Sequence, residues 1–395
     1  MNDEVGRERT LTLEHRHSWG VNSTAGRRID RDSVAIWILT RVAVFVASTY
    51  STWVFAGVRE KFVGSGTESI PSLGPIATWH RWDLDWYVSI AQSGYGAVGF
   101  ENNFAFLPGY PALLWAGGKV GLHPTLVGLI VSLIAGIVAA IALGRLARSY
   151  GISPQWTVLA WAVAPMAVYL AAPYTETLFC AMAFPAWLLA RKGRWLGASA
   201  LAVGACVVRI NGLFLACALV VLFLTTSPRP WPKLTWLALP FAALVAVFAY
   251  FHSLSGSWTV WNDAQAQGWN RHLTNPFTTA HDSWNMAFNN YLMPSFAVQY
   301  RFEIAFVVIL AAFTITMLVI RWWAEAVYVG LTLISLATST IYYSVPRAAL
   351  VLFPVWLLLG LWMTRHRWVG YGYLAISVPL MFVGVIGFVD GRWIA

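Results

Sequence analysis

The 395-residue chain is poor in charge and in cysteine. Charged residues make up only 11% of the sequence and hydrophobic residues 58%, and the apolar residues form long runs from Val34 onward. A soluble protein of this composition would need an unusually apolar surface. The three cysteines, Cys180, Cys206 and Cys217, lie inside apolar runs without the spacing of a disulfide framework or a zinc site. The sequence therefore predicts an all-α, polytopic integral membrane protein.

Lysine is also scarce, since the chain has 4 lysines against 22 arginines. The net charge of +9 comes from short basic clusters between apolar segments. This pattern is typical of the cytoplasmic loops of membrane proteins, so nucleic-acid binding is not expected. The arginine bias indicates a GC-rich bacterial genome. We therefore expect a bacterial plasma membrane protein, or an endoplasmic reticulum protein if the source is eukaryotic.

The chain divides into a tail and a membrane domain. Residues 1–33 carry six arginines and six acids without apolar periodicity, which predicts a disordered cytoplasmic tail. Residues 34–395 are predicted to form about ten to twelve transmembrane helices. Arg41, near the start of the first of them, is expected to snorkel toward the cytoplasm. Two long polar segments, 58–106 and 253–301, are expected on the outer face.

Two apolar segments are interrupted. Residues 105–118 contain two prolines and a glycine pair, so they could form a full span or a half-span. Residues 195–226 are too long for one crossing, and the interruption at Arg209–Gly212 predicts a pair of helices. If the first segment does not cross and the second turns back, the basic clusters share the cytoplasmic side; these clusters contain Arg145, Arg191, Arg229, Arg321 and Arg365.

The stretch from Arg81 to Pro111 holds three of the 17 carboxylates, Asp83, Asp85 and Glu101. Asp83 stands where a helix N-cap is expected, and Asp85 falls in the first turn of a short amphipathic helix at the membrane surface. Capping alone could explain both residues, at about 1 kcal/mol for the cap. The alternative is that they carry chemistry.

The same stretch contains an ordered set of aromatic, acidic, glycine and proline residues: Arg81, Trp82, Asp83, Tyr87, Ile90, Ala91, Gly94, Tyr95, Glu101, Ala105, Phe106, Pro108 and Pro111. This set resembles the first extracytoplasmic loop of the GPI mannosyltransferase 2 (PIG-V-like) family, which belongs to the GT-C class of polytopic glycosyltransferases. The resemblance implies a GT-C-like fold whose large first outer loop carries interfacial helices.

Further elements resemble the family beyond this loop. Tyr174 and Glu176 match a Tyr-Ser-Glu element with Thr175 in place of Ser, and Arg209 with Asn211 matches an Arg-x-Asn-Gly element. Glu176 could equally be a first-turn acid that satisfies the helix dipole, or the partner that neutralises Arg209.

Two arginines of the outer segments are further candidates. Arg347 follows Pro346 at the outer end of a span, where it could bind a lipid phosphate or anchor the interface. Arg271, with Trp261 and Gln265, resembles a pattern of bacterial relatives, and these residues would suit sugar binding or an interfacial belt. The histidines show no metal-ligand spacing, so no metal is expected.

The resemblance implies transfer of a sugar, mannose first of all, from a polyprenyl-phosphate donor to a glycolipid or lipoglycan acceptor among the membrane lipids. No cofactor is implied, because the lipid-linked sugar is a co-substrate. Asp83 would be the base with Asp85 in reserve, and the reaction would invert the anomeric carbon without a metal. The implied substrate-binding residues are Arg81, Trp82, Tyr87, Glu101, Asn103, Tyr174, Glu176, Arg209, Asn211, Arg271 and Arg347. A lipid or solute transporter and an enzyme for another polyprenyl-phosphate sugar are the alternatives.

Overall fold

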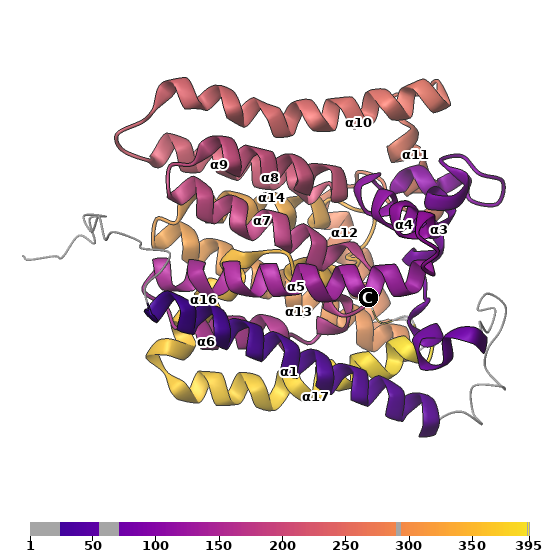
Figure 1. The fold of residues 1–395 in the computed structure, drawn as a ribbon, viewed down its shortest axis with the longest axis horizontal. Helices are drawn as coiled ribbons and strands as arrows, with labels where there is room; N and C mark the ends of the chain where they lie inside the picture. Colours follow the sequence, from indigo (N-terminus) through magenta and orange to yellow (C-terminus); the bar gives the residue numbers. More distant parts are fainter. Residues whose placement is uncertain (1–23, 55–70, 290–293, 393, 395) are drawn as a thin grey trace, which may run out of the picture.

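The computed structural model describes residues 24–54, 71–289, 294–392 and 394, and every regular element in these ranges is a helix. The long helices lie alongside one another, with α10 at one edge and α1 and α17 at the opposite edge (Figure 1). In chain order the elements are α1 Thr24–Val54, η1 Pro71–Trp79, α3 Asp83–Ser93, η2 Glu101–Ala105, α4 Gly109–Lys119, α5 Pro124–Ser149, α6 Pro154–Ala162, η3 Ala167–Leu170, α7 Thr175–Arg191, α8 Trp195–Val208, α9 Asn211–Thr225, η4 Trp231–Ala238, α10 Leu239–Ser255, α11 Val260–Trp269, α12 Pro276–Phe288, α13 Pro294–Val319, α14 Trp323–Ala337, α15 Val345–Ala349, α16 Phe353–Arg365 and α17 Arg367–Val389.

The prediction of an all-α polytopic membrane protein is confirmed. Within the described ranges, five helices are long and apolar enough to cross a membrane, and α8, α9 and α14 are shorter apolar helices. The apolar segment 155–171 does not form one continuous helix, because it is divided between α6 and η3.

The segment 195–226 is a returning pair of helices, as the break at Arg209 predicts. The Trp195 ring at the start of α8 meets the Phe223 ring near the end of α9, with the ring centroids 5.0 Å apart. Gly212 makes the tight return possible, because a Cβ there would lie 2.5 Å from the backbone nitrogen of Cys206. The other interrupted segment, 105–118, forms α4. Its 11 residues cover about 16 Å, which is about half the thickness of a bilayer core, so α4 is a half-span.

Three of the predicted cytoplasmic basic clusters lie close together, those of Arg145, Arg191 and Arg321. Arg145 is paired with Asp30 at 2.6 Å, and Arg191 donates to the carbonyl of Ser149. The neighbouring Tyr150 ring meets both the Arg191 guanidinium and the Trp322 ring, next to Arg321. These contacts bring together basic segments that are far apart in sequence, as the predicted topology requires.

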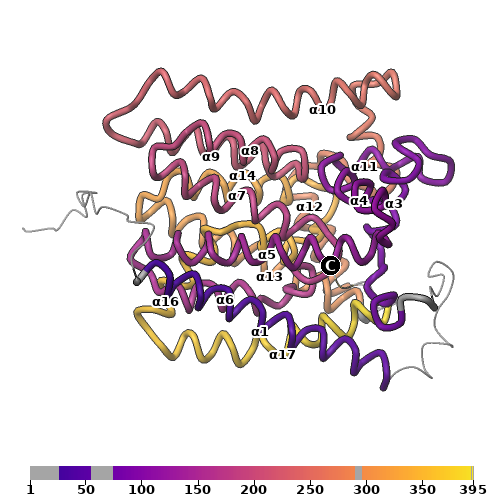
Figure 2. Tube along the Cα trace, in the orientation of Figure 1, coloured from indigo at the N-terminus to yellow at the C-terminus, as the bar shows by residue number. Residues whose placement is uncertain are grey.

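The two long polar segments meet at the other end of the bundle, where α3, α4 and α11 gather (Figure 2). Gln265 on α11 donates to the carbonyl of Ala105 on η2, and Trp269 stacks edge-on against Phe106 at 5.2 Å. Residues 55–70 of the first segment and 290–293 of the second lie outside the described residues.

Two predictions need correction. The tail predicted for residues 1–33 is already helical from Thr24, and Asp30 in this helix forms an ion pair with Arg145; residues 1–23 lie outside the described part.

The second correction concerns Arg41, which does not snorkel. Its side chain is buried and donates to the carbonyls of Ala162 and Ala167 at 2.6 and 2.9 Å. These carbonyls flank the break between α6 and η3, so Arg41 replaces the helix hydrogen bonds that the break removes.

Replacing Arg41 by Met is expected to destabilise the protein by about 1–3 kcal/mol, because two buried carbonyls lose their donor. Thermal unfolding of the purified protein in detergent measures the effect. Arg28→Met is the matched control on α1, since the Arg28 side chain is 77% exposed. Equal unfolding temperatures for the two variants would contradict this structural role.

Candidate active site

Glu176 is the centre of an ionic cluster at the end of the bundle that carries the polar segments. The chain is extended at Tyr174 and enters α7 at Thr175, which places Glu176 in the first turn with no exposed surface. Its Oε1 atom accepts hydrogen bonds from Arg209 Nη1 at 2.8 Å and from Arg347 Nε at 2.6 Å. The predicted neutralisation of Arg209 by Glu176 is therefore present, and Arg347 is a second partner.

Arg347 links this cluster to Asp83. Its Nη2 atom lies 2.8 Å from Asp83 Oδ2, while its guanidinium packs over the rings of Tyr169 and Tyr174 at 4.6 and 4.8 Å. Only 13% of the Arg347 side chain is exposed. Burial between two aromatic rings and two carboxylates contradicts the reading of Arg347 as an interfacial anchor.

Glu303 on α13 orients the short helix that carries Arg347. Its two carboxylate oxygens accept from the backbone nitrogens of Ser344 at 3.0 Å and Val345 at 2.7 Å. Ser344 has a left-handed backbone with φ 60°, a conformation that non-glycine residues seldom adopt. The buried carboxylate therefore stabilises a strained turn at the N-terminus of α15 and fixes the direction of Arg347.

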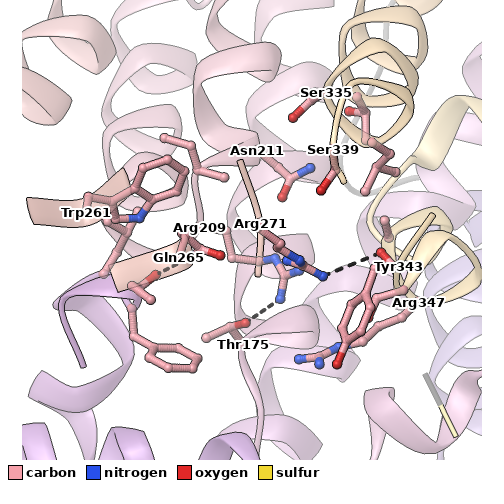
Figure 3. A pocket seen from close by; sticks show the side chains of 18 of the residues that line it. Thr175, Arg209, Asn211, Trp261, Gln265, Arg271, Ser335, Ser339, Tyr343 and Arg347 are labelled. Carbon is pink, nitrogen blue, oxygen red and sulfur yellow. Dashed lines mark hydrogen bonds between the residues drawn. The ribbon is translucent and has the colours of Figure 1, made fainter. Parts of the chain in front are cut away.

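A cavity of about 410 Å³ opens beside the cluster. Asp83 and Arg347 form one part of its wall, and both long polar segments contribute to the rest. Figure 3 shows the arginines and Tyr343 on one side, Asn211, Ser335 and Ser339 on another, and Trp261 with Gln265 on a third. Its polar lining residues are Asp83, Tyr87, Thr175, Arg209, Asn211, Trp261, Asn262, Gln265, Arg271, His272, Thr332, Ser335, Thr338, Ser339, Tyr343, Ser344 and Arg347.

Arg271 adds a third guanidinium to the cavity wall. It packs over the Tyr343 ring at 4.6 Å and donates to the Tyr343 carbonyl at 3.5 Å. Burial lowers the pKa of Arg271 from its ordinary value. Across the described ranges, Arg271 forms no ion pair, whereas Arg209 and Arg347 each do. This part of the wall is therefore suited to an anionic group.

Tyr87 lies on α3 one turn after Asp83 and also faces the cavity. Burial raises the pKa of Tyr87, and the carboxylates of Asp83 and Glu176 raise it further. Its hydroxyl is therefore a neutral group that can donate a hydrogen bond.

Six of the thirteen predicted site residues line the cavity, namely Asp83, Tyr87, Arg209, Asn211, Arg271 and Arg347. Glu176 lies behind two of the arginines.

The predicted helix α3 begins at Asp83, but the prediction that Asp83 is its N-cap is wrong. Trp82 holds the N-cap position, and no side chain caps the helix. The carboxylate of Asp83 is instead turned to Arg347.

Asp85 does not line the cavity. Its Oδ1 atom lies 2.7 Å from His80 Nε2, and the other ring nitrogen of His80 lies 2.8 Å from the Thr125 hydroxyl. Residues two positions apart on a helix point about 200° apart, so Asp83 and Asp85 face different neighbours. The expectation that Asp85 is a reserve base is therefore not supported by its position.

The remaining predicted residues support the loop around the cavity. Arg81 donates to the carbonyl of Val389, and Tyr174 donates to the carbonyl of Arg81. Asn103 is buried and bridges the backbone of Gly94 and Gly96. None of the following five lines the cavity: Arg81, Trp82, Glu101, Asn103 and Tyr174.

Glu101 is a local capping residue. Its carboxylate accepts from the backbone nitrogen of Gly99 at 2.9 Å, and backbone hydrogen bonds lower the pKa of this exposed group. In the described part of the chain, no group of three or more His, Cys, Asp or Glu side chains is arranged to hold a metal ion.

The sequence analysis did not identify Glu303, Tyr343, Ser335 or Ser339. Glu303 had one available signal, since it is a carboxylate in an otherwise apolar segment. Ser335 lies on α14 and Ser339 just beyond its end, but serine is common in apolar segments and gives no specific signal.

Comparisons with known proteins converge on the same part of the chain. Residues 74–226 match the family model described as mannosyltransferase (PIG-V). This segment is PIG-V-like. It contains Asp83, Tyr87, Glu176, Arg209 and Asn211, so the predicted family resemblance is confirmed.

Individual relatives match part of the chain. GPI alpha-1,6-mannosyltransferase 2 of Mus musculus is 34% identical over 153 residues, which are 35% of this chain and 30% of the relative. The Homo sapiens protein of that name is 33% identical over the same shares, and GPI mannosyltransferase 2 of Yarrowia lipolytica is 28% identical over 179 residues, 44% of this chain and 49% of the relative. The matches thus span about a third to a half of the relatives' length. No solved structure matches the chain.

Proposed function

We propose that this PIG-V-like membrane protein is a glycosyltransferase that moves mannose from a polyprenyl-phosphate donor to a lipid-linked glycan. One observation carries the proposal: the Asp83 carboxylate shares a cavity with three guanidinium groups, those of Arg209, Arg271 and Arg347. Such a cavity combines a proton acceptor with groups that bind phosphate. The names of the relatives support mannose as the sugar.

The charges in the cavity suit this reaction. Asp83 takes the proton of the acceptor hydroxyl, and the sugar leaves its phosphate as the new glycosidic bond forms. The leaving phosphate gains negative charge, which Arg271 and Arg347 stabilise. The proposal assigns this stabilisation to guanidinium groups and not to a metal ion, and a single base implies inversion of the anomeric carbon.

The neutral wall of the cavity suits the sugars. Asn211, Ser335 and Ser339 form no side-chain hydrogen bond with another described residue, so their donors and acceptors remain available. The Trp261 indole and the Gln265 amide line another side, and aromatic and amide groups suit a carbohydrate. We place the cavity on the extracytoplasmic face of a bacterial plasma membrane, because the opposite end of the bundle carries the basic clusters.

The proposal is tested with membranes that contain the full chain, incubated with radiolabelled polyprenyl-phosphate mannose and extracted lipid acceptors. The expected result is a new radiolabelled glycolipid. A transporter would instead move label across the membrane without forming a new product, and this outcome would refute the proposed function.

A further inference from the structure

Arg347 divides its hydrogen-bond donors between two carboxylates. Its Nε atom donates to Glu176 at 2.6 Å, and its Nη2 atom is paired with Asp83 at 2.8 Å. The proposed function requires the same two groups, Arg347 for the donor phosphate and Asp83 for the acceptor proton. In the structure each of them is engaged by the other.

The two carboxylates around Arg347 differ in how firmly they are held. Glu176 has no exposed surface and is also bound by Arg209 at 2.8 Å. Asp83 lines the cavity and keeps 19% of its side chain exposed. Among the described residues, its one ion-pair partner is Arg347. Asp83 is therefore the partner that an incoming group in the cavity can replace.

A phosphate diester is an anionic acceptor of the same kind as a carboxylate, and guanidinium binds both through paired donors. In the paired arrangement the Asp83 Oδ2 atom is already engaged by Arg347 Nη2 at 2.8 Å, so this oxygen is not free to accept from an acceptor hydroxyl. Exchange of one anion for the other on Arg347 would therefore complete the phosphate site and free the base in one event.

We propose that the donor phosphate replaces Asp83 on Arg347, so that Asp83 becomes available as the base only after the donor has bound. This inference rests on the proposed function and adds an order to it: donor binding precedes activation of the acceptor. Arg271, which has no carboxylate partner among the described residues, receives the phosphate as it enters. An acceptor that arrives first meets a carboxylate that is still paired.

The transfer that follows conserves atoms and charge. The acceptor oxygen forms a bond to the anomeric carbon and gives its proton to the Asp83 carboxylate. The bond between the anomeric carbon and the phosphate oxygen breaks, and its electron pair stays on the phosphate. The phosphate changes from a singly charged diester to a doubly charged monoester, which Arg347 and Arg271 hold until the lipid leaves.

The experiment measures the affinity of the purified full-length protein in detergent for sugar-free polyprenyl phosphate, with neutral polyprenol as the reference. Asp83→Asn should bind polyprenyl phosphate about three- to tenfold more tightly than the wild type, because no carboxylate competes for Arg347. Asp85→Asn is the matched control, since it removes a carboxylate from the same helix that pairs with His80. It should stay within about twofold of the wild type.

The outcomes separate the two proposals. Asp83→Asn affinity equal to or weaker than the wild type overturns the exchange, and so does equal tightening by Asp85→Asn, which would reflect only a change in the general field. Failure of the wild type to prefer polyprenyl phosphate over polyprenol overturns the donor assignment itself. If Asp83→Asn does not fold, Asp83→Ala and Asp83→Glu replace it, with tighter binding expected for Ala and wild-type binding for Glu.

Discussion

Replacing Asp83 by Asn is expected to reduce sugar transfer by roughly 10²–10⁴-fold, the contribution typical of a positioned general base. Asparagine retains the shape of aspartate but cannot accept the acceptor proton. Asp83 is the one cavity-lining acid among the described residues, so no neighbour lining the cavity can take over its role. The rate of radiolabelled glycolipid formation in membranes measures the loss, with the amount of variant protein determined in the same samples.

Asp85→Asn is the control for this prediction, because Asp85 pairs with His80 outside the cavity. Its transfer rate should remain close to the wild type. Near-normal transfer by Asp83→Asn, or an equal loss in both variants, would contradict the assignment of Asp83 as the base.

Glu176→Gln is expected to destabilise the protein by about 3–5 kcal/mol, because it leaves buried positive charge without its partner. The Oε1 atom of Glu176 accepts from both Arg209 and Arg347, and neither guanidinium has another fully buried carboxylate within reach in the described structure. The loss therefore exceeds that of an exposed pair, which is typically about 0–1 kcal/mol.

Unfolding of the detergent-purified variant by heat or denaturant measures this effect. Glu101→Gln is the matched substitution at an exposed acid of the same polar end of the bundle, and it should leave the unfolding temperature within the spread of repeat measurements. Equal stability of the Glu176 and Glu101 variants would show that the buried cluster does not stabilise the fold.

The fold follows from the sequence where local signals are strong. Long apolar runs predicted the helices, and the interruption at Arg209–Gly212 predicted the break between α8 and α9. The break between α6 and η3 was not predicted, because the buried carbonyls on its two sides are satisfied by Arg41, which lies more than 120 positions earlier in the chain. A hydrogen bond between residues so far apart in the chain leaves no local pattern in the amino-acid sequence.

The same distinction holds for the site. The sequence identified Asp83, Glu176, Arg209 and Arg347 one by one, and the cost of burying a charge gave the pairing of Glu176 with Arg209 as one alternative. The sequence did not predict that Arg347 joins Asp83 to Glu176, since these residues lie on three separate elements. It offered both acids of α3 as bases, and only their surroundings distinguish a carboxylate at the cavity from one paired with His80.

The anomeric configuration of the product tests the account most directly. The account places one base in the cavity and no second acid to form a covalent sugar intermediate, so transfer is a single displacement. Nuclear magnetic resonance of the purified glycolipid product should show the configuration opposite to that of the donor sugar. Retention of the donor configuration would contradict the account, because it requires a second displacement by a nucleophile that this cavity does not contain among its described lining residues.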